Sequence, residues 1–223
     1  MRPQGEFQPQ ILETNSRWIV VSKPSGMLTI PGRDSLVKNP MAQEDLKILS
    51  VWLKNKFKSV WVVHRLDRET SGVLLFARTQ ADHRTAAIWF QKRQVKKVYH
   101  CLASGVPLVP IMKVNRLIQG VPSVSQVEVR ERYQEGFFAR VTPRTGRRHQ
   151  IRIHLASSGY PIWGDSYYGG VREVSFSNES LTVDRVALHA STLELPTGEK
   201  FEASFPGDFS FWLDELRNKG SRV

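Results

Sequence analysis

Short apolar runs rich in β-branched residues recur along the chain, and this pattern limits the folds that the chain can adopt. The run at 18–22 ends at the turn sequence Lys-Pro-Ser-Gly, as a strand does. Residues 125–133 and 137–143 alternate around Gln-Glu-Gly, a pattern typical of a hairpin. The remaining strands are predicted at 60–63, 73–79, 98–103, 187–195 and 200–205.

Other segments place their apolar residues at helical spacing instead. Leu49 and Leu53 share one face of such a segment, and Gly159 follows another as a helix stop. The predicted helices are 42–57, 80–93, 149–157 and 208–219. Because strands and helices do not alternate strictly, we expect an α+β fold with a mixed, mostly antiparallel sheet flanked by helices.

The length of 223 residues suits one large domain. We expect a single domain at 17–223, preceded by a flexible N-terminal arm at 1–16 that is rich in Gln and Pro. No apolar run approaches the roughly 20 residues that cross a membrane, and no secretory signal is recognisable. The one cysteine, Cys101, excludes an internal disulfide. We therefore expect a cytoplasmic protein, as a monomer without a membrane or an obligate protein partner.

The chain carries 32 Lys and Arg against 21 Asp and Glu, a formal net charge of +11. Such an excess predicts affinity for a polyanion, because lysines and arginines that neutralise phosphates release counterions. Charge alone leaves nucleic acid, an anionic membrane and a merely basic surface open. No phosphate-binding loop, dinucleotide motif or regular Cys/His spacing is present, so we expect no cofactor and no metal.

The densest polar cluster, 64–72, lies between two predicted strands and reads His-Arg-Leu-Asp-Arg-Glu-Thr-Ser-Gly. It has two interpretations. It is either a solvated loop, with Asp67 and Thr70 as helix caps, or a functional carboxylate held between arginines. In the second case neighbouring guanidinium groups favour the ionised form of Asp67, which is then available as a nucleophile or base.

The same nine residues closely resemble the HRLDxxTSG signature of the RluA class of pseudouridine synthases. Further blocks resemble the motifs of this class and follow its order. They are Val-Ser-Lys-Pro-Ser-Gly at 21–26 with Pro-Gly-Arg at 31–33, Lys-Val-Tyr at 97–99, Thr-Gly-Arg-Arg-His-Gln-Ile-Arg-Ile-His-Leu at 145–155, Gly-Asp-Ser-Tyr-Tyr-Gly at 164–169 and Leu-His-Ala at 188–190.

The resemblance implies the isomerisation of uridine in RNA to pseudouridine without cofactor or metal. The uracil leaves its N1–C1′ bond, turns and rejoins the ribose through C5. By similarity Asp67 is the catalytic carboxylate; attack at C1′, attack at C6 and proton abstraction from the sugar remain open. Arg152 is expected to hold Asp67 by bidentate pairing, and Tyr99 to stack on the target base and assist removal of the C5 proton. Outside the family context, Arg152 would be a surface helix residue and Tyr99 a core aromatic.

The resemblance also suggests the RNA contacts. Arg65 resembles the arginine that fills the space left by an extruded base, Arg68 is a weaker phosphate contact, and His64 is expected to be structural. Two basic clusters, 91–97 and 144–148, flank the predicted site and are either phosphate contacts or a solvated face. The residues expected to bind RNA are Arg65, Arg68, Lys96, Lys97, Arg147 and Arg148.

Three departures from the family pattern concern the substrate. Glu69 stands where many relatives carry Asp, the segment 106–125 is short, and no room remains for the extra N-terminal S4-like domain of larger relatives. We expect a tRNA or rRNA stem-loop as the partner, with the modified uridine unspecified. Two other functions remain open: a non-catalytic RNA-binding or ribosome-assembly protein with this fold, and an N-glycosidase that releases the base.

Overall fold

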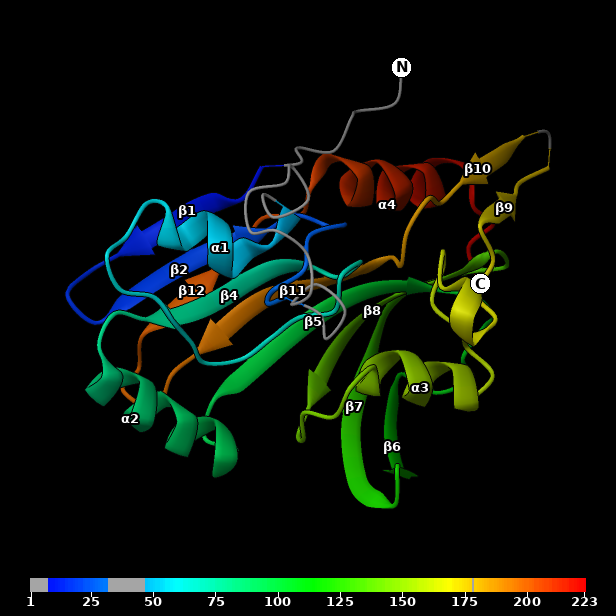
Figure 1. Ribbon diagram of the computed structural model, residues 1–223. Helices are drawn as coiled ribbons and strands as arrows, with labels where there is room; N and C mark the ends of the chain where they lie inside the picture. Colours follow the sequence, from blue (N-terminus) through cyan, green and yellow to red (C-terminus); the bar gives the residue numbers. More distant parts are fainter. Residues whose placement is uncertain (1–7, 32–46, 178) are drawn as a thin grey trace.

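A mixed ten-stranded sheet forms the centre of the protein in a computed structural model that describes residues 8–31, 47–177 and 179–223 (Figure 1). The strand order is β1-β2-β4-β11-β5-β8-β7-β6, with β3 beside β4 and β12 beside β11. All pairs are antiparallel except β4 and β11. The predicted α+β fold with a mostly antiparallel sheet is therefore confirmed.

The strands of this sheet are β1 (Gln10–Thr14), β2 (Trp18–Lys23), β3 (Trp61–Val62), β4 (Ser71–Ala77), β5 (Lys96–Ala103), β6 (Ile111–Ile118), β7 (Val121–Tyr133), β8 (Gly136–Pro143), β11 (Leu188–Glu194) and β12 (Lys200–Glu202). A separate hairpin joins β9 (Glu173–Ser175) to β10 (Ser180–Thr182). The helices are α1 (Leu49–Lys54), α2 (Gln80–Gln91), α3 (Gln150–Ser157) and α4 (Gly207–Lys219), with a short 3₁₀ helix at Ser166–Tyr168.

The half of the sheet built from β1, β2 and β4 lies between α1 and α2. Alternation along β2 explains this arrangement, because successive side chains point to opposite faces of a strand. Ile19 and Val21 join the apolar cluster that contains Leu49 and Leu53 of α1. Trp18 and Val20 join a second cluster, to which α2 contributes. Both faces of this half-sheet are thus buried.

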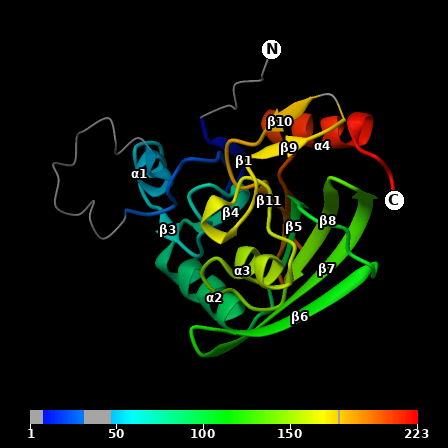
Figure 2. The same ribbon diagram turned by 90° about the vertical axis from the view of Figure 1, so that its right-hand side faces the viewer.

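The other half, built from β5, β8, β7 and β6, lies between α3 and α4. Ser125 of β7 faces α3, where its hydroxyl lies 2.9 Å from Nδ1 of His154. Phe138 points to the opposite face and stacks edge-on against Phe205 and Phe209, the latter in α4. Figure 2 shows α3 and α4 separated by these strands.

The two half-sheets meet at a short seam. Strand β11 pairs in parallel with β4 through only His189↔Ser71 and Ala190↔Gly72. Gly72 has φ +119°, and a Cβ on it would lie 2.1 Å from the Ala190 carbonyl oxygen. No side chain fits there, so the glycine that ends the 64–72 cluster is required for the two halves to join.

Beyond this seam the sheet divides. Strands β5 and β8 pair from Tyr99↔Val141 to Ala103↔Phe137. Residues 96–98 instead pair with β11, while the end of β8 stays with β7. The two strands therefore diverge on the side of Tyr99 that carries residues 96–98, as the directions of β5 and β8 in Figure 1 show. The space between them is where the functional residues gather.

Several expected elements differ from those observed. Residues 10–14, expected within a flexible arm, form β1 and pair with β2, so the arm boundary at residue 16 was wrong. The helix expected at 42–57 is observed as α1, Leu49–Lys54, and 42–46 lie outside the described residues. Strand β6 and the β9–β10 hairpin were not predicted. The β7–β8 hairpin and α2 agree closely with expectation.

No helix in the described ranges is long and apolar enough to cross a membrane.

Candidate active site

A cleft of about 840 Å³ opens where β5 and β8 diverge. A smaller pocket of about 80 Å³ adjoins it. Asp67 and Tyr99 line both, so they lie where the cleft adjoins this smaller pocket, called the inner pocket below. Arg152 lines the inner pocket alone among the three predicted catalytic residues. The structure thus brings all three together from different elements.

The loop that carries Asp67 is held through its backbone. Thr29 bonds to both the carbonyl and the N–H of Leu66 through its hydroxyl, and the Ser25 hydroxyl donates to the Glu69 carbonyl at 2.8 Å. The Thr70 N–H donates to the Asp67 carbonyl at 3.2 Å. These contacts explain why the 21–26 block accompanies the 64–72 block: the turn after β2 supports the loop that presents Asp67.

Lys23 is the buried centre of that support. Its side chain reaches the carbonyl oxygens of Pro24, Met27 and Arg68 at 2.8, 2.9 and 3.0 Å, and only 1% of the residue is exposed. Burial lowers the Lys23 pKa to about 7, with a smaller contribution from Arg185. Three carbonyl acceptors match the three donors of an ammonium group. Lys23 therefore fixes the backbone next to Asp67 without occupying the cleft.

Arg152 connects two carboxylates. Its Nε and Nη2 each donate to Asp165 at 2.7 Å, a bidentate pair that is almost fully buried. Its Nη1 faces Oδ2 of Asp67 at 3.8 Å. Burial alone would lower the Arg152 pKa, but Asp165, together with Asp67, raises it overall. The expected bidentate partner was wrong: the planar fork binds Asp165, and Asp67 receives the remaining nitrogen.

The position of Asp165 depends on a tight turn. Gly164 has φ +76°, and a Cβ there would lie 1.9 Å from the Arg185 carbonyl oxygen. The turn continues into the 3₁₀ helix, whose Tyr168 ring lies 5.0 Å from the Arg152 guanidinium carbon. Arg152 is therefore held on one side by a buried carboxylate and on another by an aromatic face. This leaves Nη1 directed at Asp67.

His149 completes the surroundings of Asp67. Its Nε2 lies 3.7 Å from Oδ1 of Asp67, and its Nδ1 lies 3.0 Å from the Tyr168 hydroxyl. Burial lowers the His149 pKa, although Asp67 acts in the opposite direction. The two Asp67 oxygens thus face different nitrogens, each about 0.5 Å beyond hydrogen-bond distance. The carboxylate is oriented while its lone pairs stay available.

Tyr99 is partly buried at the point where the sheet divides, in contact with the clusters on both sides of the seam. Burial raises the pKa of Tyr99, and the charge of Asp67 raises it further by a smaller amount. The phenol consequently keeps its proton at neutral pH. Its ring lines the cleft beside Asp67, which fits a stacking surface with a hydrogen-bond donor at its edge.

The opposite wall of the cleft is held by Gln150. Its Oε1 accepts from the Thr145 hydroxyl at 2.6 Å and from the Arg147 N–H at 3.1 Å. Its Nε2 donates to the Val124 carbonyl and to the Ser125 hydroxyl at 3.0 Å each. Every polar group of this buried amide is therefore used to fix 145–147, the segment that presents the basic residues before α3.

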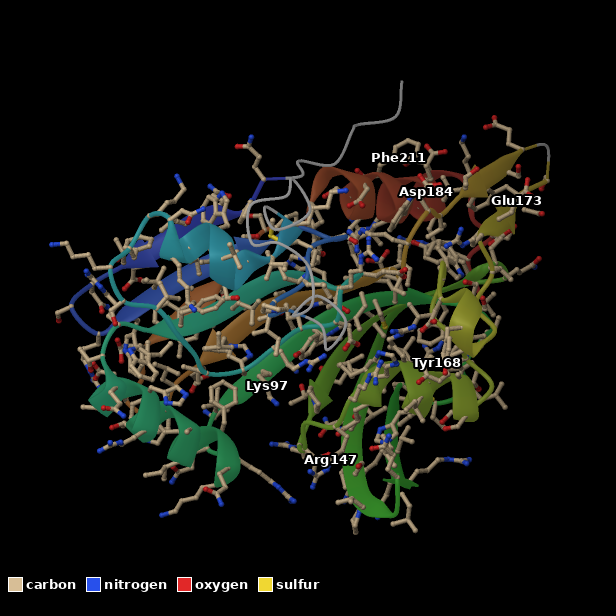
Figure 3. All side chains as sticks on the ribbon, in the orientation of Figure 1. Lys97, Arg147, Tyr168, Glu173, Asp184 and Phe211 are labelled. Carbon is tan, nitrogen blue, oxygen red and sulfur yellow. The ribbon has the colours of Figure 1, made fainter. Side chains whose placement is uncertain are left out.

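Cations cover the walls of this cleft. Arg65, Lys96, Lys97, Arg147 and Arg148 line it, and Figure 3 shows Lys97 and Arg147. Lys96 is paired with Glu194 at 2.6 Å. Within the described ranges no ion pair involves the other four, so none of them has a carboxylate oxygen within 4 Å.

Arg68 is the one predicted RNA contact that the structure places elsewhere. Its Nε donates to the Gly26 carbonyl at 3.1 Å, and it lines neither the cleft nor the inner pocket. His64 is structural, as expected. Its Nε2 accepts from the Leu75 N–H at 3.0 Å, its ring stacks on Phe90, and burial lowers its pKa to about 3.

Residues 17–157 match the family model described as RNA pseudouridylate synthase. The chain belongs to this family. It is 31% identical over 246 residues to ribosomal large subunit pseudouridine synthase D of Pseudomonas aeruginosa, covering 96% of this chain and 75% of that protein. It is 34% identical over 193 residues to the dual-specificity RNA pseudouridine synthase RluA of Vibrio cholerae, covering 78% and 72%.

Other relatives are longer than this chain, which spans 62% of ribosomal large subunit pseudouridine synthase C of Vibrio parahaemolyticus at 31% identity. Among solved structures, human RNA pseudouridylate synthase domain containing 1 superposes with a TM-score of 0.72 at 25% identity, covering 100% of this chain and 92% of that one. The fold and the sequence agree on one reaction class. An RNA pseudouridine synthase is an isomerase that converts uridine in RNA into pseudouridine.

Sequence reasoning did not assign roles to Asp165, His149 or Lys23 in this pseudouridine synthase. All three lie in blocks that resemble family motifs, at 164–169, 145–155 and 21–26. Their positions in those blocks were the available signal. Their roles depend on contacts between segments that are far apart in the chain, and only the folded structure supplies these.

Proposed function

We propose that this pseudouridine synthase isomerises specific uridines in a tRNA or rRNA stem-loop, with Asp67 as the catalytic carboxylate. One observation carries the proposal. The Asp67 side chain is 21% exposed where an open basic cleft meets a small inner pocket, and its two oxygens face donors at 3.7 and 3.8 Å. The Asp67 carboxylate is therefore accessible and oriented, and its lone pairs are not engaged by these donors.

The shape of the cleft supports binding of an extruded base. The inner pocket has roughly a tenth of the volume of the cleft, so it suits one base rather than a strand. A uridine in a stem-loop must leave its stack to enter, at a cost of a few kcal/mol. Exposed Arg65 lines both cavities, which suits a side chain that takes the vacated place in the RNA.

The reaction balances without an external group. The N1–C1′ bond breaks, a C5–C1′ bond forms, and the proton lost from C5 is replaced by one gained at N1. Asp67 assists this exchange by attack at C1′, by attack at C6 or by removal of a sugar proton. All three routes require an ionised carboxylate beside the bound nucleoside, and Nη1 of Arg152 faces Oδ2 of Asp67 at 3.8 Å.

Tyr99 and Arg152 have complementary roles in this proposal. The Tyr99 ring supplies a stacking face for the uracil, and its protonated hydroxyl supplies a donor. Arg152 directs one oxygen of Asp67 through Nη1 while Asp165 holds the rest of the fork. The cleft cations supply phosphate affinity, for which Arg65, Lys97, Arg147 and Arg148 are better placed than Arg68.

The RNA partner and setting are part of the proposal. One relative is named for the large ribosomal subunit and another for a dual specificity toward RNA, which supports rRNA as a substrate class. We place the protein in the cytoplasm as a monomer with one catalytic domain that includes β1. A comparison of pseudouridine positions across cellular RNA, with and without this protein, identifies the modified uridine.

Release of tritium from RNA labelled at uracil C5 tests the proposed function. Isomerisation releases tritium and leaves the base attached, an N-glycosidase frees uracil, and a binding protein does neither. Asp67→Asn should abolish release, whereas Asp214→Asn, a control at a 64% exposed carboxylate on α4, should not. Retained activity in Asp67→Asn would refute the role of Asp67.

Tyr99→Phe separates the two contributions of the tyrosine. Because the pKa of Tyr99 is raised, the hydroxyl keeps its proton at neutral pH and is not available as a base, so we expect stacking to dominate. Tritium release should then fall less than roughly tenfold, with unchanged RNA affinity. A fall of roughly a thousandfold at constant affinity would assign proton transfer to the hydroxyl instead.

A further inference from the structure

His149 lies beside Asp67 but takes no part in the chemistry proposed above. It immediately precedes α3, with φ 54° and ψ 22°. A residue with a Cβ adopts this left-handed region at an energetic cost that glycine avoids. The fold nevertheless holds an imidazole at this position, with its ring lining the inner pocket. A side chain kept at a strained position next to a reactive group is a candidate for a functional role.

The two ring nitrogens have different partners. Nδ1 lies 3.0 Å from the Tyr168 hydroxyl, and Nε2 lies 3.7 Å from Oδ1 of Asp67. The Tyr168 ring is itself fixed, because the Arg152 guanidinium lies 5.0 Å from its centre. One hydroxyl therefore sets the position of the imidazole, and the imidazole faces the carboxylate.

These contacts favour one tautomer. Burial raises the Tyr168 pKa, so the phenol keeps its proton and is able to donate it to Nδ1. Asp67 only accepts, so the Nε2 that faces it at 3.7 Å is favoured as the protonated nitrogen. The opposite tautomer would place the Nε2 lone pair against the Asp67 lone pairs. Both interactions of the ring are satisfied only when Nε2 carries the proton.

Charges around the ring keep it neutral. Burial is the largest influence and lowers the His149 pKa; Arg152 and Arg148 act in the same direction. Asp67 and Asp165 oppose them without reversing the shift. The Tyr167 and Tyr168 rings stand edge-on to the imidazole. A neutral donor therefore faces Oδ1, while the charged Arg152 faces Oδ2.

We propose that His149, held in its Nε2–H tautomer by Tyr168, is a positioning residue that fixes the rotation of the Asp67 carboxylate. Arg152 alone contacts one oxygen and leaves rotation about the Cβ–Cγ bond free. A second donor that faces the other oxygen at 3.7 Å restricts that rotation electrostatically. The proposal rests on the proposed function, because it concerns the presentation of Asp67 to the bound uridine.

Nitrogen NMR of histidine-labelled protein tests the tautomer without any substrate. His149→Gln assigns the signal by its loss. We expect a protonated Nε2 and an unprotonated Nδ1 at pH 7, and a mixture of tautomers in Tyr168→Phe. A protonated Nδ1 with a bare Nε2, or an imidazolium at pH 7, would overturn the proposal. The tautomer is measured on the free protein, so it decides the matter even if the RNA assay fails.

Kinetics of two matched variants test the positioning role. Phenylalanine fills the place of the ring without a donor, and glutamine places an amide N–H near the position of Nε2. Both pay the same left-handed backbone cost, so their difference reports the donor. His149→Phe should lower kcat roughly 100-fold with little change in KM, as expected for a misplaced reactive group. His149→Gln should restore most of kcat. Equal rates in the two variants would reject the role.

Discussion

Two loops present a carboxylate to the guanidinium of Arg152, and they hold it in opposite ways. Asp165 is 1% exposed, and both of its oxygens bond to Arg152 at 2.7 Å. Asp67 is 21% exposed and stays 3.8 Å from the same guanidinium. Asp165 uses both of its oxygens in hydrogen bonds to Arg152 and holds the site together. Asp67 is oriented, but its oxygens are not taken up by hydrogen bonds to Arg152, so it remains reactive. The comparison shows how one arginine can support catalysis without inactivating the catalytic group.

Asparagine substitutions at the two aspartates give the largest expected contrast. Asp67→Asn should lower turnover about 10⁴-fold or more, as loss of a central catalytic group does, with little change in stability. Asp165→Asn should lower the free energy of unfolding by about 3 to 5 kcal/mol, because it leaves the buried Arg152 charge without its partner. Chemical denaturation measures the free energy of unfolding of each variant, and tritium release measures its turnover. A stable, active Asp165→Asn variant would contradict the comparison.

Arg152→Lys tests whether one cation can serve both loops. An ammonium group lacks the planar fork, so it cannot pair bidentately with Asp165 and still face Asp67. We expect a roughly 100-fold loss of turnover with RNA binding retained. The measurement is kcat against KM in the tritium assay. Turnover close to the unsubstituted protein would show that charge suffices without the fork.

Lys23→Met weakens the support of the Asp67 loop and leaves Asp165 untouched. Three carbonyl oxygens lose their donor, and we expect a loss of about 1 to 3 kcal/mol of stability at pH 7. The pKa of Lys23 is about 7 when folded and 10.5 ordinarily. Between these values the unfolded chain binds more protons, so this group makes stability rise with pH. Unfolding of both proteins from pH 7 to 9 should show this contribution only with Lys23. An identical pH dependence would contradict the burial effect.

Arg147→Gln and Arg148→Gln test the outer part of the cleft, where the expected effects are smallest. Each should reduce the slope of log affinity for RNA against log salt by about 1. Arg172→Gln is the control, because this exposed arginine lines neither cavity. Filter binding at several salt concentrations gives the slopes. Unchanged slopes in the first two variants would remove these arginines from the phosphate contacts.

The features that depend on neighbouring residues were predicted from the sequence, and those that depend on contacts between distant segments were not. Periodicity placed α2 and the β7–β8 hairpin well, since both depend on neighbouring residues. Strand β1 was missed because an exposed edge strand lacks an apolar pattern and is defined by its pairing with β2. Strand β6 is the edge strand at the other end, and its apolar residues do not alternate strictly, since Ile111 and Leu117 are exposed.

The same distinction applies to the candidate site. Motif resemblance brought Asp67, Tyr99 and Arg152 to notice, and the structure gathers them around the inner pocket. The partner of Arg152 was beyond reach, because the choice between Asp67 and Asp165 depends on how the 164–170 turn folds against α3. Residue identity indicated a charge pair, and only geometry distinguished the two carboxylates.

The seam at Gly72 makes this active site a property of two half-sheets rather than of one motif. Asp67 belongs to the half that contains β4, whereas Tyr99 and Arg152 belong to the half that contains β5, β8 and α3. A two-residue parallel ladder with direct backbone contact aligns them. Turnover therefore depends on how the two halves dock. A substitution far from the RNA that shifts one half against the other should inactivate the enzyme while every catalytic side chain remains intact.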